Sequence, residues 1–284
     1  MTDLQAILVK AITSYVAESP LGRLKDIDGS LMWDAPLVSF ADGDDPLFSL
    51  YKTVVGEFHL TPREAMATHP KLAAGAGPLQ VPHVAVVSWV LPTAERTRRS
   101  NAEMTYGPSL RWNHTRFQGE DFNDSVRRHV IGVLDEMGYV AVAPVLSSQF
   151  KTMYQPDIAS TWSERHVAYT AGLGTFSLSD GLITARGIAH RCGSVVFNDA
   201  CVATPRPYSH YQEYCSFCVD GSCGACIDRC PAGAISPVGH DKRKCREFLS
   251  VTLAEWGKQP GFIGSYAACG LCQVGVPCEA GIPG

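Results

Sequence analysis

Residues 214–231 read YCSFCVDGSCGACIDRCP, and this stretch decides how the rest of the chain is interpreted. It contains five cysteines, three of them in a C-x2-C-x3-C-P pattern: Cys215, Cys218, Cys223, Cys226 and Cys230. A looser second group closes the sequence: Cys245, Cys269, Cys272 and Cys278. Thiolates at such spacing converge on a cube of iron and sulfide, and the cysteine before the proline ligates the other cluster of a pair. The sequence therefore predicts two [4Fe–4S] clusters.

The spacing also predicts how the ligands divide between the clusters. The first cluster takes Cys223, Cys226, Cys278 and either Cys215 or Cys218, because the usual C-x2-C spacing would place its first ligand at Asp220. The second takes the remaining cysteines of the pattern: Cys230, Cys245, Cys269 and Cys272. The C-x5-C spacing at the end of the chain is wider than usual, and small loop insertions explain both departures.

Structural zinc is the alternative, because C-x2-C pairs also suit a tetrahedral zinc ion. The Pro231-Ala-Gly-Ala-Ile continuation and the position of the second cysteine group weigh against zinc. Nine of the eleven cysteines lie in the last ~70 residues, at ligand spacing. That distribution favours metal ligation in a reducing cytoplasm over a disulfide scaffold.

The composition is that of an ordinary globular protein of 284 residues, with a net charge of −4. This slightly negative net charge gives no indication of a basic surface that would bind DNA. The first twenty residues have helical spacing of apolar residues without a cleavage site, so we expect no secretory or twin-arginine signal. No apolar run approaches membrane-spanning length. We therefore expect a cytoplasmic protein that binds neither DNA nor a membrane.

The first 80 residues are expected to form a helical and irregular region. Residues 1–20 predict an amphipathic helix, and residues 21–50 predict loops with a short strand at 37–40. Thr61, Pro62 and Glu64 form the start of a helix with a capping box. Breaks are expected at Pro70 and at residues 75–78.

Residues 81–210 are expected to form an α/β core, because strand and helix patterns alternate. The apolar runs at 83–91 and 139–143 predict buried strands, and they flank a helix at 121–137 that follows a polar stretch at 93–118. A helix at 163–172 precedes two short strands, 181–185 and 193–197, which we expect to pair. Residues 211–284 form the cysteine-rich module, with one helix at 241–256 between the two cysteine groups.

Residues 171–184 read AGLGTFSLSDGLIT and are followed by Arg191 and a predicted strand that begins Gly193-Ser194. With the cysteine-rich tail, this segment resembles the cobalamin-dependent iron–sulfur reductases, which include epoxyqueuosine reductases and reductive dehalogenases. The resemblance implies an oxidoreductase with a nitroreductase-like core that holds base-off cobalamin, and a bacterial-ferredoxin-like module packed over the corrin. The chain lacks the Asp-x-His-x-x-Gly motif that supplies a histidine to cobalt, which agrees with a base-off cofactor.

The resemblance also implies site residues. The cofactor contacts would be Gly172, Leu173, Gly174, Thr175, Phe176, Ser177, Arg191, Gly193 and Ser194. Dehalogenases of this family use a tyrosine helped by a basic residue as proton donor, and the candidates here are Tyr154, Tyr169 and His166. Each residue has a plainer interpretation as well. Residues 172–175 suit a helix C-cap, Tyr169 suits core packing, and Arg191 suits a surface ion pair.

Three functional hypotheses follow. In the first, two clusters pass electrons to base-off cobalamin, which reduces a small organic molecule or modified nucleoside. An external low-potential donor of ferredoxin or flavodoxin type would supply the electrons. In the second, the chain activates or handles the corrinoid of another protein. In the third, it is a cobalamin-free electron carrier, although such a carrier needs little beyond the cluster module.

Overall fold

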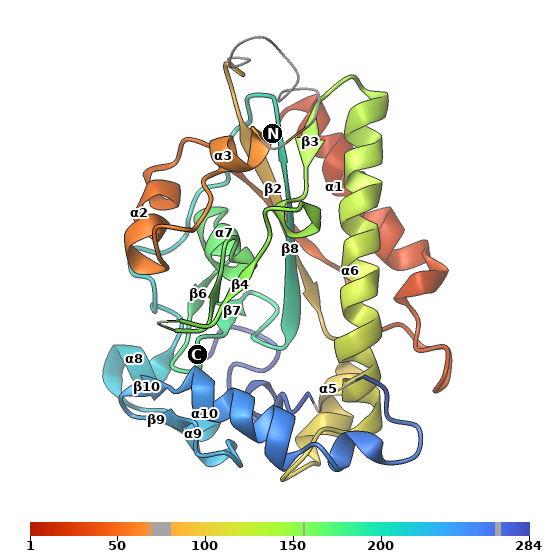
Figure 1. The fold of residues 1–284 in the computed structure, drawn as a ribbon, viewed down its shortest axis with the longest axis vertical. Coiled ribbons are helices and arrows are strands. Elements are labelled where there is room, and N and C mark those ends of the chain that lie inside the picture. Colours follow the sequence, from red (N-terminus) through yellow and green to blue (C-terminus); the bar gives the residue numbers. More distant parts are fainter. Residues whose placement is uncertain (68, 70–80, 156, 265–267) are drawn as a thin grey trace.

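The structure is a computed structural model that describes residues 1–67, 69, 81–155, 157–264 and 268–284. Its centre is an antiparallel sheet in the order β1–β2–β8–β3 (Figure 1). The strands are β1 (Leu37–Asp42), β2 (Ala85–Pro92), β8 (His190–Phe197) and β3 (Ala141–Val142). The predicted strand at 83–91 is therefore the buried strand β2, and the overall class is mixed α/β as expected.

Both faces of β2 are covered because its side chains alternate between two hydrophobic clusters. Val87 and Trp89 point into the cluster beneath α1 (Asp3–Glu18) and α6 (Leu110–Glu136). Val86 points into the opposite cluster. That second face is covered by α2 (Pro46–Val54), α3 (Pro62–Met66) and α7 (Glu164–Thr170). The sheet thus lies between two layers of helices (Figure 1).

Local signals explain several helix boundaries. Thr61 and Glu64 form the expected reciprocal capping box at the start of α3. A second capping box, between Thr2 and Gln5, begins α1. The helix α2 begins with Pro46 after an Asp45 cap, inside the segment where we expected loops.

The cysteine-rich module lies at one end of the sheet, near α5 (Glu95–Ala102) (Figure 1). Its elements are short: α8 (Ser216–Asp220), α9 (Ala225–Asp228), β9 (Ile235–Ser236), β10 (Gly239–His240) and α10 (Lys242–Glu247), with a π-helical turn at Phe248–Thr252. Two further hairpins belong to the core: β4 (Thr152–Met153) with β5 (Ala159–Ser160), and β6 (Gly174–Phe176) with β7 (Leu182–Thr184).

Three expectations were wrong. The strand at 181–185 does not pair with the strand at 193–197, because β7 pairs with β6 while β8 joins the central sheet. The polar stretch at 93–118 contains α5 and the beginning of α6, so the helix expected at 121–137 starts at Leu110. The helix expected at 241–256 ends as an α-helix at Glu247. The breaks expected at 70 and at 75–78 lie outside the described residues.

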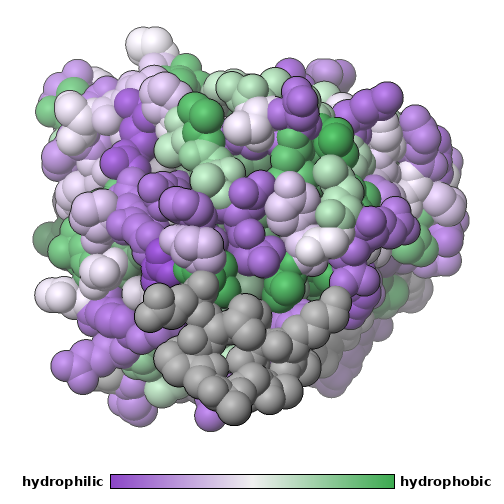
Figure 2. All heavy atoms as spheres, turned by 90° about the horizontal axis from the view of Figure 1, so that it is seen from above, coloured by the Kyte–Doolittle hydropathy of each residue, from purple (hydrophilic) through white to green (hydrophobic). Residues whose placement is uncertain are grey.

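The end of the molecule farthest from the cysteine-rich module carries a mixed surface. Hydrophobic and hydrophilic residues are interspersed over its described part (Figure 2). Among the residues that the structure describes, none of the helices combines the length and the apolarity that crossing a membrane requires.

Candidate iron–sulfur clusters and adjoining cavity

The module gathers its cysteines into the two predicted groups. Cys223, Cys226, Cys278 and Cys215 line one small hollow of about 20 Å³, which Ile183 and Ile188 close with apolar side chains. The other predicted group lines a larger cavity: Cys230, Cys245, Cys269 and Cys272. Cys272 lines both spaces, so the two groups adjoin each other.

The chemistry of both groups suits clusters that carry iron. Burial and then the neighbouring thiols raise the pKa of Cys226 to about 11 and that of Cys278 to about 12. Burial also raises the pKa of Cys269 to about 11. Several buried thiols side by side are therefore costly to ionise without a cation, and a bound metal removes that cost by deprotonating them outright. None of the eleven cysteines forms a disulfide.

Backbone N–H groups are directed at the sulfur atoms. Ala234 N–H donates to Cys230 Sγ at 3.3 Å, and Leu271 N–H donates to the Cys269 thiol. Hydrogen bonds of this kind tune iron–sulfur potentials. Within the described part of the chain, no set of three or more His, Cys, Asp or Glu side chains is arranged to hold a single metal ion.

The larger cavity has a volume of about 510 Å³ and lies between the second cysteine group and the core. Its core wall combines aromatic, hydroxyl and basic side chains: Trp33, Thr93, Trp112, Thr115, Arg116, Arg165, His190 and Arg191. No aspartate or glutamate occurs among its described lining residues. The wall therefore favours an anionic group or a partner with hydrogen-bond acceptors.

The loop that carries Cys269 and Cys272 is fixed to the core. Arg229 Nε donates to the carbonyl of Val274 at 3.1 Å and its Nη1 donates to that of Met104 at 3.0 Å. Asn101 Nδ2 donates to the carbonyl of Cys269 at 3.1 Å. Gly270 has a φ of +63°, and a side chain there would strike the ring of Trp112. These contacts hold the second group against the cavity.

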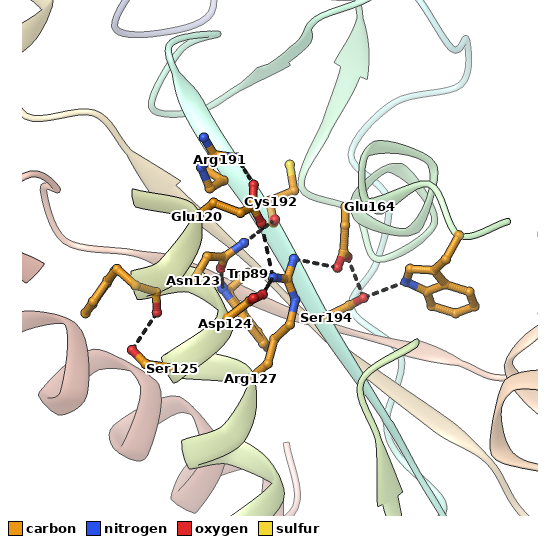
Figure 3. A network of polar contacts seen from close by, with 12 residues as sticks. Trp89, Glu120, Asn123, Asp124, Ser125, Arg127, Glu164, Arg191, Cys192 and Ser194 are labelled. Atoms are coloured by element: carbon orange, nitrogen blue, oxygen red, sulfur yellow. Dashed lines mark hydrogen bonds and ion pairs between the residues drawn. The ribbon is translucent and has the colours of Figure 1, made fainter. Parts of the chain in front are cut away.

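An ion-pair network supports the cavity from inside the core (Figure 3). Arg191 on β8 pairs with Glu120 on α6, and its Nη2 donates to the carbonyl of Arg116 at 2.9 Å. Glu120 also approaches Arg127, which pairs with Asp124 at 2.6 Å and with Glu164 at 2.9 Å. The neighbouring arginines hold the pKa of Glu120 below its usual value, although burial opposes them. The network fixes the direction in which Arg191 meets the cavity.

The predicted proton donors lie elsewhere. Tyr154 is 49% exposed, and its ring lies 4.1 Å from the Arg246 guanidinium. Tyr169 packs against Tyr208 with ring centroids 5.1 Å apart. His166 Nδ1 lies 2.7 Å from Ser163 Oγ, and burial lowers the pKa of His166 to about 3. None of the three is among the described lining residues of the cavity, so their role stays a prediction.

Most of the predicted cofactor contacts also lie away from the larger cavity. Of these residues, Arg191 is the one among its described lining residues. Gly172, with a φ of +83°, and Gly174 lie against the chain's own carbonyl groups, those of Pro205 and Ile183. Gly172 and Leu173 follow the end of α7, and Thr175 and Phe176 lie in β6. Ser177 lines the small hollow instead. Gly193 packs against Trp89, and the Ser194 hydroxyl donates to Glu164 at 2.5 Å.

Sequence reasoning missed several cavity residues. His240 Nδ1 lies 3.3 Å from Asp180, and hydrogen bonds to Asp180 and to Cys245 raise the pKa of His240 to about 9. Trp112 and Arg165 also line the cavity, from helices that are distant from the module in sequence. No local pattern identifies such residues, because only the tertiary fold brings them to the cysteines.

The solved structures to which this chain is similar include reductases. No protein-family model and no curated protein sequence matches the chain. The structure is similar to epoxyqueuosine reductase from Bacillus subtilis, with 18% identity, a TM-score of 0.45, and coverage of 98% of this chain and 67% of that one. The same values hold for epoxyqueuosine reductase with a modified tRNA-Tyr stem loop.

A catabolic reductive dehalogenase is also similar, with 16% identity and a TM-score of 0.47 over 87% of this chain and 30% of that one. Both kinds of neighbour are members of the reductase family that the sequence resembles.

Proposed function

We propose that the chain is an iron–sulfur reductase in which two [4Fe–4S] clusters deliver electrons to an acceptor in the 510 Å³ cavity. One observation carries the proposal: the four cysteines of the second group form one wall of that cavity, and core side chains form the other. An electron carrier would present its cluster to the outside. Here the second cluster would instead face a partly open space between the module and the core, where a small reactant could bind.

We propose that the electrons pass through the two cysteine groups in turn. The first group would receive them from an external low-potential donor of ferredoxin or flavodoxin type. Cys272 lines both the small hollow and the cavity, so it lies between the two cluster positions. The second cluster would then be the one that meets the acceptor. A reducing cytoplasm is the proposed setting, because it keeps the ligand thiols reduced and out of disulfides.

We propose base-off cobalamin as the acceptor. The cavity of about 510 Å³ would take part of such a group, and its lining suits it in chemistry: Trp33 and Trp112 are aromatic, and Thr93, Arg165 and Arg191 carry hydrogen-bond donors for carboxamide and phosphate oxygens. His190 Nε2 lies 2.7 Å from the carbonyl oxygen of Leu182, and its Nδ1 lies 3.6 Å from Cys192 Sγ. Both nitrogens of His190 thus have partners within the chain. When bound, cobalamin supplies a strongly reducing, nucleophilic metal centre.

The chain's own residues would bind and orient the reactants. Arg191 lines the cavity and is held by Glu120 and by the Arg116 carbonyl, so the position of its guanidinium on the wall is fixed. The basic wall favours a substrate that carries an acceptor-rich or anionic group, within the proposed class of small organic molecules and modified nucleosides. Aromatic walls and the docked cysteine loop would exclude water.

Retention of cobalamin tests the proposal. After anaerobic reconstitution with iron, sulfide and hydroxocobalamin, we expect the protein to leave gel filtration with stoichiometric cobalamin and a base-off visible spectrum. Arg165→Gln, on the cavity wall, should weaken retention by about tenfold, the effect of losing one charge-assisted hydrogen bond. The matched control is Arg23→Gln, whose guanidinium donates to Gly29 on the surface.

The alternatives give different results. A protein that holds both clusters and releases all cobalamin is an electron carrier, and it contradicts the proposed acceptor. A protein that keeps cobalamin but reduces substrates only with a second corrinoid protein present is an activator or handling protein. Turnover with a chemical reductant and no partner protein supports the reductase.

A further inference from the structure

The module contains one more cysteine than two cubanes need. Four thiolates complete each [4Fe–4S] cluster, and the nine cysteines of residues 211–284 leave one over. The second group already has its four cysteines, so the extra cysteine belongs to the candidates for the first group. There, Cys223, Cys226 and Cys278 share one hollow, and the fourth ligand has to come from the segment that precedes them.

Asp220 stands at the position where the usual spacing places that ligand, but its carboxylate is used elsewhere. The side chain is exposed, and its Oδ1 accepts a hydrogen bond from Ser222 N–H at 2.8 Å. This bond belongs to a tight turn at Gly221, which has a φ of +76° and ends α8. The carboxylate therefore stabilises the turn that leads into the Cys223 loop.

Cys215 and Cys218 differ in their relation to the hollow. Cys215 is 7% exposed, immediately precedes α8, and lines the hollow beside Cys223, Cys226 and Cys278. Its N–H donates to the carbonyl of Gln212 at 3.0 Å, so the backbone that carries the thiol is held in place. Cys218 lies within α8, is only partly buried, and is not among the described residues that line the hollow.

We propose that Cys215 is the fourth ligand of the first cluster and that Cys218 is a free thiol beside it. The proposal rests on the proposed iron–sulfur function. It gives the first cluster the ligand order Cys215, Cys223, Cys226 and Cys278, with seven residues between the first two ligands. The short helix α8 and the Gly221 turn take up that extra length.

Alkylation of the loaded wild-type protein tests the assignment without a variant. Iron is measured first, and a wild-type protein without iron refutes the iron–sulfur function itself. In iron-loaded protein treated anaerobically with iodoacetamide, mass spectrometry should find Cys218 labelled and Cys215 unlabelled. Cys215 should become labelled once a chelator and denaturant have removed the cluster. Labelling of native Cys215, or protection of Cys218 that is lost when a chelator alone removes the iron, overturns the proposal.

A matched pair of variants gives an independent readout. Cys218→Ser should keep the iron content of the wild type and the same electron paramagnetic resonance spectrum after reduction. Cys215→Ser should lose iron from the first cluster and change that spectrum. Full iron with an unchanged spectrum in Cys215→Ser, or iron loss in Cys218→Ser, contradicts the assignment.

Discussion

Cys272→Ser is expected to remove about half of the bound iron and to stop electron delivery to the cavity. The side chain lines both the small hollow and the larger cavity, so it would ligate the second cluster at the point nearest the first. Burial raises the pKa of its thiol, and a serine hydroxyl is a much poorer iron ligand than a thiolate. Iron and sulfide analysis after anaerobic reconstitution measures the loss.

The companion variants make the result specific. Cys226→Ser should remove the other half of the bound iron, which belongs to the first cluster, and the double variant should lose nearly all of the iron. The matched control is Cys201→Ser, because Cys201 lies outside the module and its thiol donates to the carbonyl of Ala41, a bond that a hydroxyl also makes. Full iron in Cys272→Ser, or zinc in the wild type, would show that the ligand assignment is wrong.

The cysteine groups could be predicted because ligand spacing is a local property of the sequence. Residues 223–230 carry enough cysteines at fixed intervals to indicate the cluster type, and the remote ligands follow from the number of thiolates required. The strand β2 could also be predicted from the sequence, because its continuous apolar run reflects burial on both faces. The choice between Cys215 and Cys218 needed the structure, because both positions satisfy the count.

The start of α6 could not be predicted from polarity. Asn113 and His114 are buried polar residues on its first turns, and they resemble loop residues in the sequence. In the structure Asn113 exchanges hydrogen bonds with Ile263, at 3.0 and 2.9 Å, and His114 Nε2 lies 2.7 Å from the Gly261 carbonyl oxygen. Their polar groups form hydrogen bonds with residues about 150 positions away in the sequence, and no local pattern reveals such partners.

Strand pairing failed for a related reason. A run of three residues such as β7 holds little information about its partner, since a short strand with both faces buried fits several registers. The close approach of Gly174 to the carbonyl of Ile183 favours β6 as its neighbour. The eight-residue strand β8 instead pairs with β2 along its whole length, from the pair Ala85 and Phe197 to the pair Pro92 and His190.

Arg127→Met is expected to lower the free energy of unfolding by about 3–5 kcal/mol, the usual cost of removing one partner of a buried ion pair. The Arg127 side chain is 2% exposed and bridges α6 to Glu164 on α7 beside β8 (Figure 3). Its removal leaves the buried Glu164 carboxylate with a hydrogen bond from the Ser194 hydroxyl and without its guanidinium partner. Urea unfolding of the iron-loaded protein under anaerobic conditions measures the change.

The pH dependence and two further variants identify the cause. Burial already raises the pKa of Glu164, and losing Arg127 should raise it further, so the destabilisation should be largest at neutral pH and shrink as acid protonates Glu164. Arg127→Met combined with Glu164→Met should recover part of the loss, because no buried charge is then uncompensated. Arg128→Met, one position along the same helix on its exposed face, should change stability by no more than about 0.5 kcal/mol. Equal effects of the Arg127 and Arg128 variants would refute a structural role for the network that orients Arg191.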